Sequence, residues 1–265
     1  MLTYESLIEQ AKVRGMPSGK MRGVLREYLQ ILILKEMSKH KSGHKLFFTG
    51  ETYLRLAHNT GRFSEDLDFN ARGLSKNEFE GLVRHCQTEL RRFNLDSEVS
   101  FKHWGKMLVG FMTFTDVEKT YNVISKHSKK EGLKIKIETN SPDWKIKDET
   151  LIISGFGEMY PLLCTDIGAL FADKIDALTK KNRARHLYDI IFMLSNKILV
   201  DMKVLKSLGI KKNPMDAIKD RVESFSIEEL KKQADELRPF LFDESQSGLI
   251  LNAKSIVPQL IKQYA

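Results

Sequence analysis

Residues 47–70 read FFTGETYLRLAHNTGRFSEDLDFN, and the order of elements in this stretch decides the fold. A short apolar strand at 46–48 runs into a turn at 49–52, and residues 53–58 then follow the spacing of a helix. The run Asp-Leu-Asp-Phe at 66–69 alternates polar and apolar side chains, as a half-buried strand does. The sequence therefore predicts a strand, a tight turn, a helix and a second strand in close succession.

The second of these strands carries two carboxylates on one side. Residues two apart in a strand share a face, so Asp66 and Asp68 present paired carboxylates while Leu67 and Phe69 face the core. Such a pair repels unless a cation lies between its members. Mg²⁺ suits it because this ion prefers hard oxygen ligands and completes its shell with triphosphate oxygens and water. A solvated strand face also produces Asp-x-Asp, so both interpretations remain open.

The turn upstream has the composition of a phosphate site. Gly50 directly follows an apolar strand, and Thr52 lies where the helix opens. A glycine at this point lets backbone N–H groups form a concavity, and the helix dipole favours an anion there. An ordinary strand-to-helix connection also favours Gly and Thr. Together, the turn and the two aspartates predict a phosphate-binding site next to a metal-binding site.

The rest of the first 160 residues mixes helices and strands. Apolar periodicity predicts a long helix at about 20–40, and the capping box formed by Ser75 and Glu78 opens a helix that runs to about residue 93. Alternating residues predict three further strands, at 98–104, 107–115 and 133–139.

From Thr165 onward the pattern is almost wholly helical. Helices are expected at 165–181, 183–195, 202–208, 214–222, 226–237 and 248–264. The fold class is therefore α+β, with a mixed β-sheet flanked by helices at 1–160 and a C-terminal helical bundle at 161–265. We place the boundary between these domains near Tyr160-Pro161.

Composition and charge narrow the classes of function. The 265 residues are 42% hydrophobic and 29% charged, enough for a full core. No signal peptide or apolar run long enough for a bilayer is visible, so we expect a cytoplasmic protein without a membrane partner. The two cysteines, Cys86 and Cys164, indicate neither a disulfide framework nor a zinc site. A net charge of +8 favours polyanions such as nucleic acid, although it serves solubility equally well.

Residues 47–70 resemble the signature of the AbiEii-type nucleotidyltransferases, toxins of abortive-infection and toxin–antitoxin systems. In that family a Gly-Gly-Thr/Ser turn and a helix precede an Arg-x-Ser-x-Asp-x-Asp strand. The resemblance implies a nucleotidyltransferase fold, with Gly50 and Thr52 in the phosphate-binding turn, Arg62 and Ser64 as supporting nucleotide-binding residues, and Asp66 and Asp68 as Mg²⁺ ligands. Glu51 stands where the family usually has a second glycine, and pairing with Arg55 one helical turn on would keep its charge from the triphosphate.

The same resemblance extends to three more candidate catalytic residues. Lys174, in Asp-Lys-Ile-Asp-Ala-Leu, is similar to the family's phosphate-contacting lysine, and Asp189, in Arg-x-x-Tyr-Asp, to the aspartate of its final motif. Glu138 is our candidate for the third carboxylate that polymerase-like relatives carry on a neighbouring strand. Each has a structural alternative. Lys174 could instead bury its aliphatic stem and hold its ammonium in solvent, and Asp189 could form a buried ion pair with Lys174 or Arg185 that joins two helices. Glu138 also suits an exposed strand face with Lys134 and Lys136.

These residues predict Mg²⁺-dependent transfer of a nucleoside monophosphate from an NTP to an acceptor hydroxyl. The resemblance to tRNA-modifying family members implies tRNA or another RNA as acceptor, and a cognate antitoxin as partner. Two rival functions remain, namely a nucleotide-binding regulator without catalysis and a basic RNA-binding module whose acidic pair is incidental.

Overall fold

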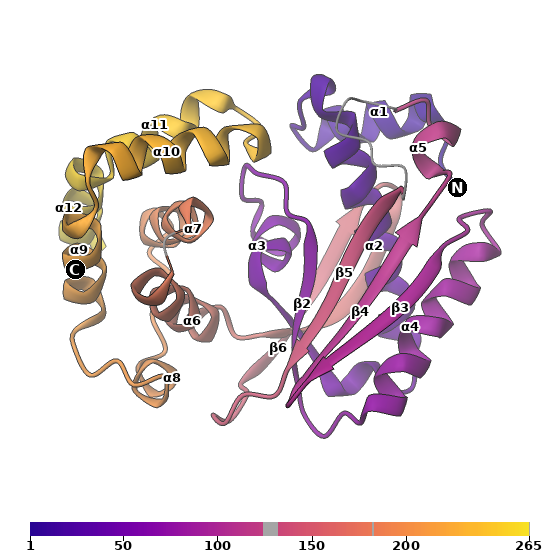
Figure 1. Ribbon diagram of the computed structural model, residues 1–265, viewed down its shortest axis with the longest axis horizontal. Helices are drawn as coiled ribbons and strands as arrows, with labels where there is room; N and C mark the ends of the chain where they lie inside the picture. Colours follow the sequence, from indigo (N-terminus) through magenta and orange to yellow (C-terminus); the bar gives the residue numbers. More distant parts are fainter. Residues whose placement is uncertain (124–131, 182, 265) are drawn as a thin grey trace. The chain divides into compact units, whose positions relative to one another are not determined.

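The computed structural model describes residues 1–123, 132–181 and 183–264 (Figure 1). The chain divides into an N-terminal unit, Met1–Pro142 with Asp148–Thr165, and a C-terminal unit, Asp143–Lys147 with Asp166–Ala265. The expected boundary at Tyr160-Pro161 lies inside a strand that ends at Thr165, the last residue of the N-terminal unit.

A mixed β-sheet forms the centre of the N-terminal unit. In the described residues it has seven strands, in the order β3-β4-β5-β2-β1-β7-β6. Strand β2 pairs antiparallel with β1 and parallel with β5, while β1 pairs parallel with β7. The strands are β1 (Leu46–Thr49), β2 (Asp66–Ala71), β3 (Glu98–Trp104), β4 (Met107–Phe114), β5 (Leu133–Asn140), β6 (Asp148–Gly155) and β7 (Glu158–Thr165).

Two of these strands, β6 and β7, are absent from the sequence-based prediction. They form an antiparallel hairpin whose turn holds Gly155, Phe156 and Gly157 at positive φ. A proline inside a run normally argues against a central strand because it cannot donate to the ladder. Pro161 is tolerated because β1 pairs with β7 beyond it, at Phe48↔Cys164.

The helices of the N-terminal unit are α1 (Tyr4–Val13), α2 (Met21–Lys39), α3 (Gly50–His58), α4 (Lys76–Arg91) and α5 (Val117–Thr120). Helices α2 and α4 pack against each other, with α2 also on β7 and α4 on β3 and β4, whereas α3 packs on β1, β2 and β6. The capping box of Ser75 and Glu78 is confirmed. Helix α3 begins at Gly50 rather than at residue 53, because the expected turn is itself the first turn of the helix.

The C-terminal unit is helical, which confirms the α+β class. Its helices α6 and α7 pack against each other, α8 and α9 pack on α6, and α10, α11 and α12 pack on α7. They are α6 (Ile167–Lys180), α7 (Ala184–Ser195), α8 (Met202–Ser207), α9 (Pro214–Ser224), α10 (Ile227–Leu237), α11 (Gly248–Leu251) and α12 (Ala253–Tyr264).

The single helix expected at 248–264 is divided in the structure at Asn252. The side-chain amide of Asn252 donates to the Gly248 carbonyl, an alternative partner that competes with the regular helical bonds. None of the described helices combines the length and the apolar character required to cross a bilayer.

Candidate functional site

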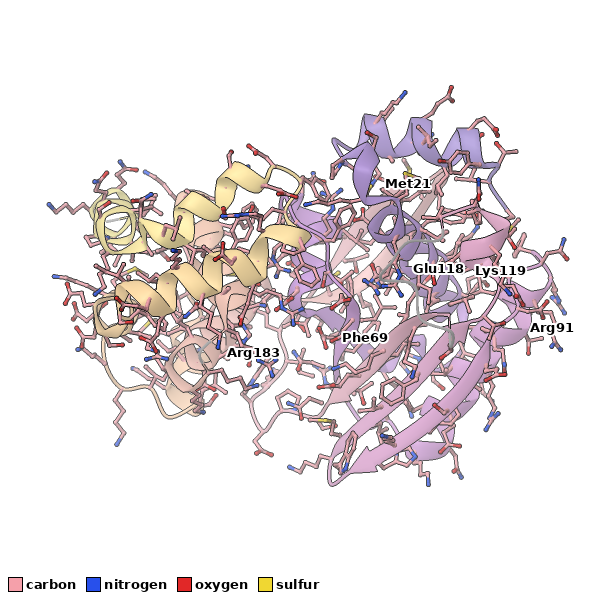
Figure 2. All side chains as sticks on the ribbon, turned by 45° about the horizontal axis from the view of Figure 1, so that its top comes forward. Met21, Phe69, Arg91, Glu118, Lys119 and Arg183 are labelled. Carbon is pink, nitrogen blue, oxygen red and sulfur yellow. The ribbon has the colours of Figure 1, made fainter. Side chains whose placement is uncertain are left out.

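Strand β2 presents its two aspartates as the alternation predicts. Leu67 and Phe69 are buried, 0% and 2% exposed, whereas Asp66 and Asp68 on the other face are only partly buried (Figure 2 labels Phe69). On the parallel neighbour β5, Lys136 lies beside Asp66 and Glu138 beside Asp68. The structure therefore brings Glu138 next to the aspartate pair.

The turn at the start of α3 lies against Asp68. Gly50 has a φ of +81°, a conformation that side chains disfavour, and a Cβ added to it would lie 2.4 Å from Asp68 Oδ2. The preceding residue, Thr49, is the N-cap of α3 and makes no side-chain capping hydrogen bond. Glycine is thus required here by both the backbone conformation and the closeness of the carboxylate.

Thr52 ties the turn to the strand from inside, and Gln30 holds the backbone at Ser64. The hydroxyl of Thr52, which is fully buried, donates to the backbone carbonyl of Asp66 and so ties α3 to the start of β2. The amide of Gln30 on α2 donates to the carbonyl of Ser64 at 3.2 Å. The Thr52 hydroxyl therefore fixes the position of Asp66, a role that the sequence did not predict.

Glu51 forms an ion pair across the turn. Its Oε2 lies 3.1 Å from Nη1 of Arg62, whose side chain is 1% exposed. The sequence suggested Arg55 as the partner, but Arg55 donates instead to Glu27 of α2 at 2.9 Å. Arg14 also contacts Glu27 at 2.9 Å, so a buried network of charges anchors α3 to α2.

The carboxylates around Asp68 make the site strongly negative. Burial, followed by the charges of Asp66, Glu51 and Glu138, raises the pKa of Asp68 to about 7. A lysine offsets part of this charge. Lys136 Nζ lies 3.2 Å from Asp66 Oδ2 and 2.8 Å from Glu138 Oε2. Although partial burial opposes its charge, the hydrogen bond to Glu138 and the charge of Asp66 raise the pKa of Lys136 above its ordinary value.

The raised pKa of Asp68 predicts how stability depends on pH without metal. With a pKa near 3.8 unfolded and about 7 folded, the proton on Asp68 stabilises the fold fully below about pH 4, and this contribution is lost as pH rises through about 7. We therefore expect Asp68→Asn to melt about 4 °C or more above the wild type at pH 8 in EDTA. Thermal melts at pH 5 and pH 8 measure this.

The exposed carboxylate Asp96 provides the control for these melts. Asp96 pairs with Arg91 on the surface, and both side chains are exposed. Asp96→Asn removes the same charge and should leave the melting temperature at pH 8 within about 1 °C of the wild type. Equal melting temperatures for Asp68→Asn and the wild type at pH 8 would contradict the raised pKa.

The two candidates in the C-terminal unit pair with each other. Lys174 Nζ of α6 lies 2.6 Å from Asp189 Oδ2 of α7, and the two side chains are 5% and 0% exposed. Lys174 therefore does not hold its ammonium in solvent. A role for either residue in nucleotide binding or catalysis stays a prediction.

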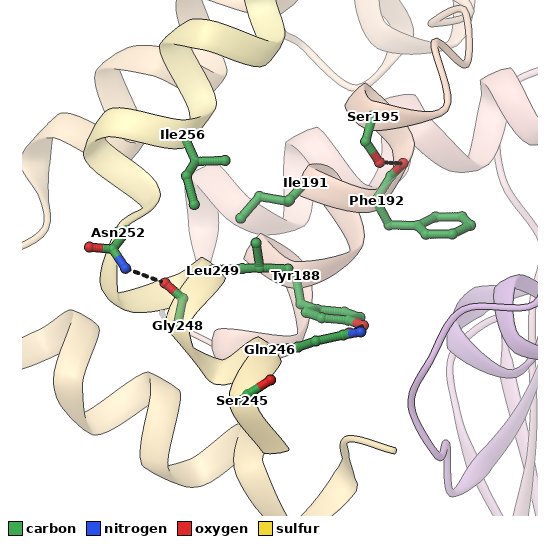
Figure 3. Close-up of a pocket in the computed structure, with 10 residues that line it drawn as sticks. All are labelled: Tyr188, Ile191, Phe192, Ser195, Ser245, Gln246, Gly248, Leu249, Asn252 and Ile256. Carbon is green, nitrogen blue, oxygen red and sulfur yellow. Dashed lines mark hydrogen bonds between the residues drawn. The ribbon is translucent and has the colours of Figure 1, made fainter. Parts of the chain in front are cut away.

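Tyr188, beside Asp189, faces a cavity of about 540 Å³ within the C-terminal unit (Figure 3). Its hydroxyl donates to Gln246 Oε1 at 2.6 Å, and Phe192 one turn further along α7 also lines the cavity. The Arg-x-x-Tyr-Asp segment thus directs its tyrosine towards this cavity and its aspartate towards α6.

Comparison with known families decides the affiliation of the chain. The model of a family described as "Nucleotidyl transferase AbiEii toxin, Type IV TA system" matches residues 32–250. The chain belongs to the AbiEii family. It is therefore a nucleotidyltransferase of the kind that acts as the toxin of a type IV toxin–antitoxin system, which confirms the resemblance seen in residues 47–70.

Solved structures show the same fold. MenT4, a nucleotidyltransferase toxin from Mycobacterium tuberculosis H37Rv, has a TM-score of 0.57 and 16% identity, over 100% of this chain and 94% of that one. JHP933 from Helicobacter pylori has a TM-score of 0.53 and 20% identity, over 91% of this chain and 94% of that one. No curated protein matches the chain significantly. The AbiEii assignment thus rests on the family match, and these structures support its nucleotidyltransferase fold.

Proposed function

We propose that this AbiEii-family chain moves a nucleoside monophosphate from an NTP to a hydroxyl group of RNA in a Mg²⁺-dependent reaction. One observation carries the proposal. The Gly50 turn, which has no room for a Cβ, meets the Asp66 and Asp68 pair, with Glu138 in register on the adjacent strand. A turn suited to phosphate and oxygen ligands suited to its metal thus adjoin within one unit.

The donor set fits a hard divalent cation. Asp66 and Asp68 would hold Mg²⁺, and burial, together with the charges of Asp66, Glu51 and Glu138, raises the pKa of Asp68. Within 1–123, 132–181 and 183–264, no three acidic, histidine or cysteine side chains already converge as a preformed site. Mg²⁺ takes one or two protein carboxylates and completes its shell with phosphate oxygens and water. When bound, the ion would neutralise charge on the triphosphate as pyrophosphate leaves.

The residues of the turn and the neighbouring strand have separate roles in this proposal. The backbone at Gly50 approaches the phosphates, while Thr52 fixes Asp66 through its carbonyl and Arg62 holds the Glu51 carboxylate. Glu138 acts as a further ligand or accepts the proton of the attacking hydroxyl. Its pairing with Lys136, which also contacts Asp66, keeps it close to β2.

RNA as the acceptor, tRNA in particular, is supported by the net charge of +8, which attracts phosphate backbones. The type IV toxin–antitoxin affiliation supports a cognate antitoxin as the partner that controls the activity.

A labelling assay tests the proposed function. The purified chain is incubated with total tRNA and each of the four NTPs labelled at the α-phosphate, with Mg²⁺ or with EDTA. We expect label in RNA for at least one NTP and none in EDTA. Tight NTP binding by calorimetry without label transfer would instead support a nucleotide-binding regulator. RNA binding that is unaffected by Asp66→Ala, without NTP binding, would support an RNA-binding module.

The Glu51 and Arg62 ion pair gives a second test, of stability. Glu51→Ala removes a carboxylate partner from a guanidinium that is 1% exposed, so we expect a loss of about 1–3 kcal/mol in the free energy of unfolding, measured in urea. Glu51→Gln keeps an acceptor oxygen for Arg62 and should lose less than half as much. An unfolding free energy unchanged in Glu51→Ala would show that the pair does not support the turn.

A further inference from the structure

Strand β5 places a lysine ammonium between two carboxylates of the proposed metal site. Lys136 Nζ lies 3.2 Å from Asp66 Oδ2 and 2.8 Å from Glu138 Oε2, and all three side chains are between 26% and 38% exposed. The parallel register fixes this arrangement, because it sets Lys136 opposite Asp66 and Glu138 opposite Asp68. A cation of the chain itself therefore bridges the acidic residues of both strands.

We propose that Lys136 is an internal counter-ion that keeps free Mg²⁺ out of the site and yields to the metal when a nucleoside triphosphate binds. This inference rests on the proposed function. The ammonium offsets one of the two negative charges of Asp66 and Glu138 while the site is empty, so metal alone must compete with it for the same oxygens. A triphosphate supplies new anionic oxygens, to which the ammonium can turn when the metal takes its carboxylates.

The charges around the site favour the replacement of Lys136 by the metal only when a nucleotide is bound. The carboxylates of Asp66, Glu51 and Glu138 create a negative field that raises the pKa of Asp68, and the positive charge of Lys136 opposes that field. Without nucleotide, Mg²⁺ can bind the carboxylates only if the Lys136 ammonium leaves them for water. With nucleotide, the displaced ammonium finds several phosphate oxygens. Metal and nucleotide should therefore each increase the affinity of the site for the other by the same factor.

Titration calorimetry with MgCl₂, on the full chain with and without a non-hydrolysable NTP analogue, tests the proposal. Lys136→Met keeps the length of the side chain and removes its charge. We expect it to bind Mg²⁺ about tenfold more tightly than the wild type in the absence of nucleotide, because one positive charge leaves the ligand set. The nucleotide analogue should then improve metal affinity much less than it does in the wild type.

Two control variants separate this role from a general effect of charge or folding. Lys136→Arg retains a cation and should bind free Mg²⁺ as weakly as the wild type. Lys134→Met removes a charge from the same face of β5, two residues away, and should change metal affinity by less than about threefold. Circular dichroism of each variant shows whether the fold is retained. If Lys136→Met does not fold, Lys136→Arg provides the comparison, and it should bind metal with the same dependence on nucleotide as the wild type.

The failure of this inference can be distinguished from failure of the proposed function. Metal affinity without nucleotide that is equal or lower in Lys136→Met, with a folded chain and metal binding by the wild type, overturns the counter-ion role alone. So does a Lys136→Arg variant that has lost the dependence of metal binding on nucleotide. Absence of metal binding in the wild type, with and without nucleotide, overturns the proposed metal site as well.

Discussion

Asp68→Asn is expected to lower the rate of nucleotide transfer by about a thousandfold or more while the chain stays folded. A metal ion at a phosphoryl site supplies several kcal/mol of transition-state stabilisation, and each 1.36 kcal/mol lost is a factor of about ten in rate. Asparagine keeps the shape of the side chain beside Gly50 but offers a neutral oxygen in place of a carboxylate. The rate is measured as α-phosphate label incorporated into RNA per unit time.

The same variant separates chemistry from stability. Because Asp68 carries a raised pKa in the folded chain, its asparagine replacement should be more stable than the wild type at pH 8 in EDTA and yet transfer label about a thousandfold more slowly. Loss of rate therefore cannot come from unfolding. Asp96→Asn, with the same substitution at an exposed ion pair, should transfer label at the wild-type rate. Transfer by Asp68→Asn within tenfold of the wild type would exclude this aspartate as a metal ligand.

Local patterns predicted most of the fold and the position of the aspartate pair. The alternation at Asp66 and Asp68 needs only the two-residue period of a strand, and the capping box of Ser75 and Glu78 needs only a spacing of three. Both features are written within a few neighbouring residues. The hairpin of β6 and β7 escaped prediction because Pro161 obscures it, and its tolerance depends on where a distant strand, β1, stops pairing.

The contacts that complete the site are not local, and these could not be read from spacing. Arg55 lies one helical turn from Glu51, yet it pairs with Glu27, which is far away in sequence, while Glu51 pairs with Arg62 across the turn. The bridge made by Lys136 depends on the parallel register of β2 and β5, two strands that are separated in the chain by α4, the β3–β4 hairpin and α5. The alternation of residues predicted which side chains of β5 share a face, but it could not predict which strand lies beside β5.

The largest expected loss of stability follows from breaking the Lys174 and Asp189 pair. Lys174→Met leaves the carboxylate of Asp189, which is 0% exposed, without the ammonium that lies 2.6 Å away. Removing one member of a buried pair costs about 3–5 kcal/mol, because the remaining charge stays buried. Urea unfolding measures the loss. The control is Lys180→Met on the same helix, whose partner is Asp176 and whose side chain is 62% exposed, with an expected cost below about 1 kcal/mol.

The double variant Lys174→Met with Asp189→Leu distinguishes the two interpretations that the sequence left open. Apolar side chains of similar volume often replace a buried ion pair without loss, so the double variant should recover most of the stability of the wild type. If the pair only joins α6 to α7, this stable variant also transfers label at the wild-type rate. If Lys174 contacts the nucleotide phosphates, as the AbiEii motif implies, the variant is stable but transfers label at least about a hundredfold more slowly, since a positioned cation is lost. A single Lys174→Met variant no less stable than Lys180→Met would contradict the buried pair itself.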